Sequence, residues 1–213
     1  MTVALLVFDL DGTLVPTMED YADQAASLME AHLATPWHDA RRDYFRTSGL
    51  PFQKQLRQLY PDRDDTDSVA ERFEQWKDGY LRAIALPAPV ERLFGEWRDR
   101  GFRIAISSNN MQAYVDRLAQ DWPVDFALGF RPEDGFAKGE DHFRTLEARF
   151  GFGRERMVFT GDSPNDARIA RDTGVAFRAL LTTAFRPEDF RAVDPAIVLL
   201  DGLDQLVATL PIG

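Results

Sequence analysis

Asp9 and Asp11 stand where the first apolar segment of the sequence, residues 3–10, gives way to Gly12. An Asp-Gly pair by itself is an ordinary turn, in which the carboxylate bonds to nearby backbone. Asp9, however, lies inside the apolar run, where a carboxylate is costly unless a cation or another partner compensates its charge. Its position therefore indicates chemistry in addition to a turn.

A second pair of acids, Asp162 and Asp166, follows the apolar segment 157–161. The intervening Ser163 and Pro164 fit a helix N-cap with proline at the first helical position, and Asp162 also fits as the cap. A cap does not account for acids after two separate apolar segments. Carboxylates without His or Cys suit Mg²⁺, which takes one or two of them together with water and a substrate phosphate. The acids thus predict a Mg²⁺ site.

Hydroxyl and amide side chains follow a third apolar segment, at Ser107, Ser108 and the two asparagines after them. Beside a helix N-terminus such groups suit a phosphate oxygen, although Ser and Asn are also ordinary caps. Lys138 precedes a helical pattern at 142–150 and offers the positive charge that an acidic protein needs near a phosphate. A lone lysine there is usually only solvated, so each of these signals is weak by itself.

The apolar segments that carry these residues are short and bounded by turn residues, which is typical of strands buried on both faces. The expected strands cover residues 3–10, 102–107, 124–129, 157–161 and 196–200. Helical patterns separate most of them, and this alternation predicts an α/β fold with a doubly wound parallel sheet. Ligands bind at the carboxyl ends of such strands, so we expect the acids, the hydroxyls and the lysine to meet at one edge.

Residues 16–87 differ from the rest of the chain because they are helical in period and contain no convincing strand. The helical patterns cover residues 19–34, 39–46, 52–59 and 67–86. Pro16 on one side and the proline-rich segment 86–89 on the other mark the edges of this stretch. We therefore expect an α/β core of residues 1–15 and 88–213, interrupted by a helical domain at 16–87.

The composition excludes several classes of protein. The 213 residues carry a net charge of −10, which argues against binding nucleic acid or an anionic membrane through bulk charge. The absence of cysteine excludes disulfides, thiolate catalysis and Cys-ligated metals, and 3 histidines disfavour a histidine metal cluster. The N-terminal apolar run meets Asp9 too soon for a signal peptide or a membrane span of about 20 residues. We expect a cytoplasmic protein that is a monomer or a weak homo-oligomer, since no heptad seam predicts a coiled coil.

Taken in chain order, these motifs resemble those of the haloacid dehalogenase superfamily. Its signature is D-x-D-G-T at the first strand, Ser or Thr at the second, Lys before the fourth and G-D-x-x-x-D after it. The sequence has these motifs at residues 9–13, Ser107, Lys138 and 161–166. The family has a Rossmann-like core, and the helical stretch matches the cap of its phosphoglycolate-phosphatase-like and β-phosphoglucomutase-like members.

The resemblance implies that Asp9 and Asp11 are the catalytic residues. Asp9 would attack phosphorus and form an aspartyl-phosphate, which splits one difficult displacement into two easier ones. Asp11 would protonate the leaving alkoxide and then activate water. Dehalogenases of the family have an aromatic residue at the second position, so Asp11 disfavours carbon–halogen cleavage.

The resemblance also implies the binding residues. The phosphoryl oxygens would be held by Ser107, Ser108 and Lys138. The Mg²⁺ ion would be held by Asp9, the backbone carbonyl of Asp11 and Asp162, with Asp166 supporting the site.

Substrate choice should lie in the cap, at a loop and helix start that includes Arg46 and Lys54. These cations would contact an anionic substrate tail, although surface-exposed basic residues are the ordinary alternative. Two departures weaken any subfamily assignment. Residues 15–17 replace the acidic-and-small pair often found after D-G-T-L, and Gly139 stands where Pro is frequent.

The prediction is a Mg²⁺-dependent phosphatase that hydrolyses a small phosphorylated metabolite through an aspartyl-phosphate. A phosphomutase or a phosphonate hydrolase would reuse the same core. A non-catalytic phospho-acceptor regulatory module would also gather acids, a hydroxyl and a lysine at strand ends, but it has no use for a leaving-group acid at Asp11.

Overall fold

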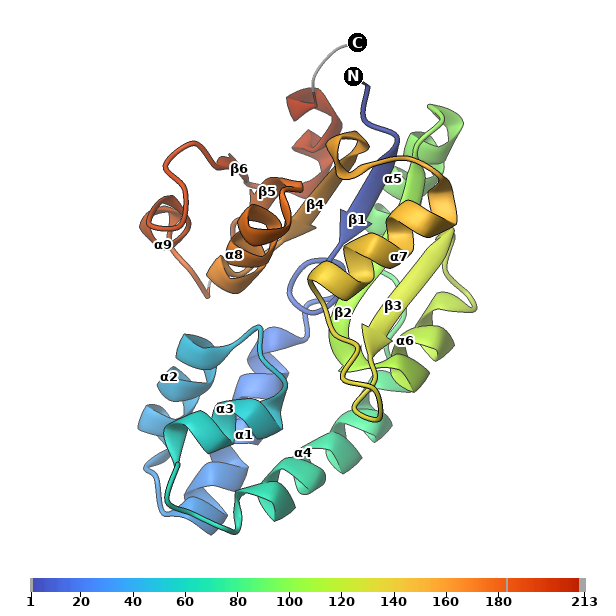
Figure 1. Cartoon of the computed structure of the whole chain (residues 1–213). Coiled ribbons are helices and arrows are strands. Elements are labelled where there is room, and N and C mark those ends of the chain that lie inside the picture. Colours follow the sequence, from blue (N-terminus) through green and yellow to red (C-terminus); the bar gives the residue numbers. More distant parts are fainter. Residues whose placement is uncertain (1, 183, 211–213) are drawn as a thin grey trace. The chain divides into compact units, whose positions relative to one another are not determined.

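The computed structural model describes residues 2–182 and 184–210 and contains a six-stranded parallel sheet in the order β3-β2-β1-β4-β5-β6 (Figure 1). The strands are β1 (Leu5–Phe8), β2 (Arg103–Met111), β3 (Phe126–Phe130), β4 (Met157–Gly161), β5 (Ala176–Leu180) and β6 (Val198–Leu200). From β1 the chain winds outward through β2 to β3, returns to β4 on the other side of β1, and winds outward again. The predicted doubly wound sheet is confirmed, and its switch point lies between β1 and β4.

Helices cover both faces of this sheet (Figure 1). They are α5 (Ala88–Asp99), α6 (Gln112–Ala119), α7 (Glu140–Phe150), α8 (Pro164–Thr173) and α9 (Pro187–Arg191). Leu5 and Val7 of β1 join a buried cluster with Phe143 of α7, whereas Phe8 packs against the rings of Phe94 and Trp97 in α5. All four residues of β1 are buried, because side chains that alternate along the strand are covered from both sides.

One strand was not predicted. The apolar segments predict five strands, and β5 is not among them because Arg178 interrupts its apolar run. The structure accommodates this arginine at the half-buried position by hydrogen bonds from its guanidinium to the Thr209 carbonyl and hydroxyl, at 2.8 Å each. A charged residue that finds such acceptors does not exclude a strand.

The chain divides into two compact units, residues 1–15 with 85–213 and residues 16–84. The second unit contains α1 (Met18–Leu33), α2 (Trp37–Thr47), α3 (Phe52–Leu59) and α4 (Thr66–Leu81). Its core is aromatic, with the rings of Phe52 and Phe73 4.4 Å apart and Tyr44 beside both. The expected extension of its last helix to residue 86 is wrong, since α4 ends at Leu81. Among the described residues, no helix combines the length and apolar character needed to span a membrane.

Candidate active site

Asp9 is the first residue after β1, and its backbone N–H donates to the carbonyl of Thr160 in β4 at 2.9 Å. The chain then turns at Gly12, whose φ of +79° lies in the left-handed region that glycine adopts without strain. The Gly12 N–H donates to the carbonyl of Val15 at 2.8 Å and closes this turn. The Asp-x-Asp-Gly sequence thus ends the strand, and its tight loop holds Asp11 close to the sheet edge.

The second acidic segment ends β4 and begins α8. Ser163 is the N-cap, as one interpretation of the sequence predicts: its Oγ accepts from the Asp166 N–H at 3.2 Å and donates to Asp166 Oδ2 at 2.6 Å. Pro164 occupies the first helical position, where its missing N–H costs nothing. Gly161 permits this turn, because a Cβ at that position would lie 2.7 Å from the Asp166 Cβ.

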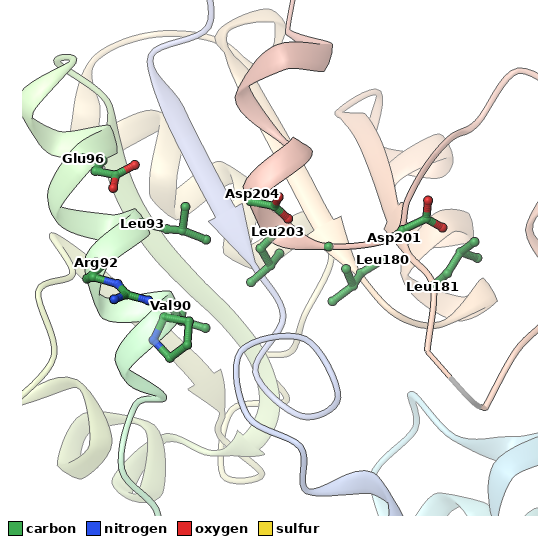
Figure 2. Close-up of a pocket in the computed structure, with 11 residues that line it drawn as sticks. Val90, Arg92, Leu93, Glu96, Leu180, Leu181, Asp201, Leu203 and Asp204 are labelled. Atoms are coloured by element: carbon green, nitrogen blue, oxygen red, sulfur yellow. The ribbon is translucent and has the colours of Figure 1, made fainter.

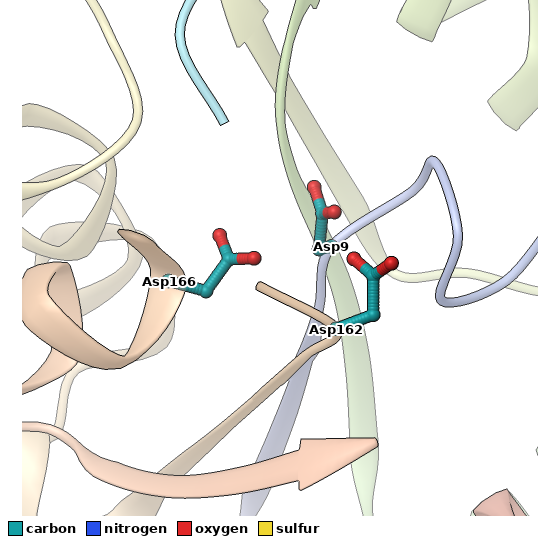
Figure 3. Close-up of side chains that lie close together, drawn as sticks. All are labelled: Asp9, Asp162 and Asp166. Atoms are coloured by element: carbon teal, nitrogen blue, oxygen red, sulfur yellow. The ribbon is translucent and has the colours of Figure 1, made fainter. Parts of the chain in front are cut away.

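These two segments bring three carboxylates together (Figure 3). Asp9, Asp162 and Asp166 are all buried, and one carboxylate oxygen of each lies within 4.8 Å of the others. Lys138, whose side chain is only 3% exposed, donates to Asp9 Oδ1 at 2.5 Å and to Asp166 Oδ1 at 2.9 Å. Residues more than a hundred positions apart in the sequence therefore form one charged cluster at the switch point.

Burial governs the protonation of this cluster. It raises the pKa of Asp9 to about 7, although the charge of Lys138 opposes the rise. Burial also raises the pKa of Asp162 well above its ordinary value, and the neighbouring Asp9 and Asp166 add to the effect. Burial acts to lower the pKa of Lys138, but Asp166 and Asp9 together raise it, so the ammonium stays charged. One cation faces three acids, so without a further cation the protonated forms of Asp9 and Asp162 are favoured.

The cluster fits a divalent cation. Asp162 Oδ2 is buried and has no hydrogen-bond partner within the described part of the chain. An ionised buried oxygen without a partner is costly, and a cation would satisfy it. The ligands are all oxygen, which Mg²⁺ prefers. Asp9 and Asp162 therefore suit the predicted metal site, and Asp166 lies beside them.

The end of β2 completes this edge of the sheet. Phe8 of β1 pairs with Ile106, so Asp9, just past the end of β1, lies beside Ser107. The expected end of the second strand at residue 107 is wrong, since β2 continues to Met111. The Ser107 hydroxyl lies 2.9 Å from Nδ1 of His142, a fully buried residue of α7. The Ser108 hydroxyl accepts from the Asn110 N–H at 3.0 Å, and the Asn110 side chain donates from Nδ2 to Asp11 Oδ2 at 2.6 Å.

The tautomer of His142 follows from its two contacts. Its Nε2 lies 3.2 Å from the carbonyl of Gly129, which can only accept, so Nε2 carries the proton. Burial lowers the pKa of His142 to about 3, and the ring is neutral. Nδ1 therefore accepts, and the Ser107 hydroxyl donates to it.

Neither His142 nor the contact of Asn110 with Asp11 is predicted from the sequence. His142 stands four residues after Lys138, but a single histidine in a helical pattern gives no partner. Asn110 belongs to the predicted group of amides, yet its contact with Asp11 spans 99 residues. Arg46 and Lys54 lie in the helical unit, both exposed, and Arg46 pairs with Asp43 at 3.0 Å.

A groove of about 730 Å³ lies elsewhere on the α/β unit, between α5 and the segment 201–204 (Figure 2). Apolar side chains such as Val90, Leu93 and Leu203 line it together with Arg92 and acids. None of the predicted site residues is among its lining residues. The groove is therefore distinct from the acidic cluster.

The chain belongs to the haloacid dehalogenase-like hydrolase family, whose model matches residues 6–171. It is 23% identical to pyrophosphatase PpaX of Halalkalibacterium halodurans, covering 97% of this chain and 96% of that one. It is 25% identical to phosphoglycolate phosphatase of Caulobacter vibrioides, over 94% and 88% of the two chains. A haloacid dehalogenase-like hydrolase from Streptococcus pneumoniae has the same fold, with a TM-score of 0.78, 19% identity and coverage of 97% and 98%. The chain is thus a hydrolase of this family, and these sequence relatives are named a pyrophosphatase and a phosphatase.

Proposed function

We propose that this chain is a Mg²⁺-dependent phosphatase that hydrolyses a small phosphorylated metabolite through an aspartyl-phosphate, an acyl phosphate formed on Asp9. The observation that carries the proposal is the buried cluster in which Asp9, Asp162 and Asp166 meet Lys138. The family membership and the phosphatases among the relatives support the reaction class. Because those relatives are named for different substrates, they do not specify one for this chain.

In the first step, a carboxylate oxygen of Asp9 attacks phosphorus, and the bond from phosphorus to the ester oxygen breaks. Asp11 gives its proton to the departing alkoxide. In the second step, Asp11 takes a proton from water, whose oxygen attacks phosphorus and displaces Asp9. Inorganic phosphate leaves, and both aspartates return to their starting states. This division of labour requires one acid that stays ionised and one that exchanges a proton.

Lys138 supports the ionised form of Asp9, since its ammonium donates to Asp9 Oδ1. The same ammonium would face the phosphoryl oxygens once a substrate enters. Bound to Asp9, the Asp11 carbonyl and Asp162, Mg²⁺ would supply positive charge that screens Asp9 from the dianionic phosphate and stabilises the charge that builds up during transfer. Asp166 positions Lys138 through its own contact at 2.9 Å.

Of the two serines predicted to bind phosphate, Ser108 suits the role better. The Ser107 hydroxyl donates its proton to Nδ1 of His142. It therefore has no proton left to donate to a phosphoryl oxygen. The Ser108 hydroxyl accepts the Asn110 N–H and keeps its own proton available for a phosphoryl oxygen. We therefore propose that Ser108 contacts phosphate and that Ser107 fixes β2 against α7.

The proposal is tested by phosphate release from a panel of small phosphate monoesters, with Mg²⁺ and with a chelator. We expect metal-dependent release by the wild-type protein. The isosteric Asp9→Asn variant should lose at least about a thousand-fold in kcat, because its amide is not a nucleophile. Circular dichroism of the variant checks that the fold is retained. Release by Asp9→Asn at the wild-type rate, or an absence of release across the panel, would refute the proposal.

A further inference from the structure

Asn110, close to the carboxyl end of β2, is 2% exposed and makes one short side-chain contact. Its Nδ2 donates to Asp11 Oδ2 at 2.6 Å. The opposite orientation of the amide would place its oxygen against the Asp11 carboxylate, so the contact itself identifies which end is nitrogen. The backbone N–H of Asn110 donates to Ser108 Oγ at 3.0 Å and ties the residue to the same strand end.

The other end of the amide is not satisfied. Asn110 Oδ1 is buried and has no hydrogen-bond partner among the residues that the structure describes. A buried acceptor without a partner costs free energy, and an apolar side chain at this position would avoid that cost. Stability of the fold therefore does not account for an asparagine here. The amide is explained by its donated hydrogen bond to Asp11.

We propose that Asn110 is a positioning residue for proton transfer by Asp11. This inference rests on the proposed function, in which Asp11 is the general acid and base. Because Oδ2 accepts the amide N–H, the carboxyl group is held in one orientation and the proton to be transferred is carried on Oδ1. An acid that is held in place transfers its proton at the distance and angle that the leaving oxygen requires.

This role can be separated from a structural one by the choice of leaving group. An alkoxide is a poor leaving group and needs a proton from Asp11 as it departs. The phenolate of p-nitrophenyl phosphate leaves without one. Since kcat/KM reports the steps through departure of the leaving group, a defect in proton donation lowers it for alkyl esters and leaves the aryl ester far less affected.

The experiment compares kcat/KM for p-nitrophenyl phosphate and for the best alkyl phosphate of the substrate panel. We expect Asn110→Ala to lower the alkyl value by about 10- to 100-fold, and the ratio of alkyl to aryl values by at least about ten-fold. Asn110→Leu keeps the approximate shape but has no donor, so it should show the same change in ratio. The control Gln112→Ala removes a neighbouring, part-buried amide contact, from the Gly129 N–H at 2.6 Å, and should keep the wild-type ratio.

Thermal unfolding of the same variants adds a second readout. Asn110→Ala should unfold at the wild-type temperature or above it, because it removes an unsatisfied buried oxygen. An equal loss on both substrates, or a wild-type ratio in Asn110→Leu, would overturn the inference. If the wild-type protein hydrolysed neither ester, the proposed function would fail and this inference with it. If the wild-type protein is active and the Asn110 variants keep its ratio of alkyl to aryl kcat/KM values, the inference about Asn110 fails and the proposed function stands.

Discussion

Asp162 is the carboxylate at the site with the greatest need for a cation, because its Oδ2 is buried without a hydrogen-bond partner in the described chain. We expect Mg²⁺ at about 100 times its dissociation constant to stabilise the fold by about 2.7 kcal/mol, a rise of about 5–10 °C in Tm. Asp162→Asn should lose most of this rise. When a chelator removes the metal, Asp162→Asn should be at least as stable as the wild-type protein, because the substitution removes a buried carboxyl group that can be charged.

Differential scanning fluorimetry with and without Mg²⁺ measures both effects. Ca²⁺ serves as a comparison ion, because its larger size and longer ligand distances test whether the site is selective. An equal Mg²⁺ shift in the wild-type protein and in Asp162→Asn would show that the ion binds elsewhere.

His142 gives the protein a pH-dependent stability whose sign follows from its buried, neutral ring. Its pKa is about 3 when folded and about 6.5 when unfolded, so below pH 6.5 the unfolded chain binds the extra proton. Stability is fully present above pH 6.5 and is lost as the pH falls. Between pH 7 and pH 5 the loss from this residue is about 2 kcal/mol.

Urea unfolding at several pH values tests this prediction. His142→Asn should have a smaller loss of stability between pH 7 and pH 5 than the wild-type protein, whereas His38→Asn, at an exposed position, should keep the wild-type slope. Identical slopes in the wild-type protein and His142→Asn would contradict the burial argument.

Not every residue of the site could be predicted from the sequence. Asp9 and Asp162 could be predicted, because acids that follow apolar segments are conspicuous and the carboxyl ends of parallel strands lie at one edge of the sheet. His142 and Asn110 could not, because their importance lies in single hydrogen bonds to residues far away in the chain. A pattern of residue types predicts which strand ends meet, but not which side chain holds another in place.

At the scale of the elements, the turn from β4 into α8 depends on Gly161. A Cβ there would lie 2.7 Å from the Asp166 Cβ and 2.8 Å from its Oδ2, too close for the helix to keep its place. Gly161→Ala should therefore displace Asp166, lower stability by about 1–3 kcal/mol and reduce kcat at least about ten-fold.

The matched control is Gly95→Ala, within α5, where an added Cβ meets nothing within 4 Å. Alanine is the better helix former, so this variant should be about 0.5–1 kcal/mol more stable and fully active. Chemical denaturation and phosphate release measure both variants. Wild-type stability and activity in Gly161→Ala would contradict the close packing of this turn.

Most elements could be predicted because their periodicity is strong, and the exceptions have local reasons. β5 was missed because Arg178 breaks its apolar run, and only the fold supplies the acceptors at Thr209. The last helix of this unit was predicted to reach residue 86 because Pro87 is the first clear stop signal. In the structure α4 ends at Leu81, and residues 82–86 lie outside the helix. Local patterns predict the type of an element better than its ends.

At the scale of the whole molecule, the helical unit is proposed to act as a cap that selects the substrate. Arg46 and Lys54 are its candidate contacts for an anionic substrate tail, and Arg46 is 65% exposed at its side chain. For a substrate with a second anionic group, we expect Arg46→Ala and Lys54→Ala to raise KM by about ten-fold each with little change in kcat.

The control is Arg42→Ala, which removes an equally exposed arginine of α2 that pairs with Asp39 at 2.9 Å. It should leave KM unchanged. Steady-state kinetics on esters with and without the second anionic group measure the difference. An unchanged KM in both Arg46→Ala and Lys54→Ala would assign substrate choice to other residues.

The central claim is that Asp9 becomes phosphorylated during turnover, and trapping that acyl phosphate tests it most directly. The wild-type protein is quenched in acid while it hydrolyses an excess of its best substrate with Mg²⁺, and borohydride then reduces the acyl phosphate. Peptide mass spectrometry locates the reduced residue, with Asp9→Asn as the blank. We predict homoserine at position 9 in the wild-type protein. Reduction at another aspartate, or none under steady turnover at any quench time, would contradict the account.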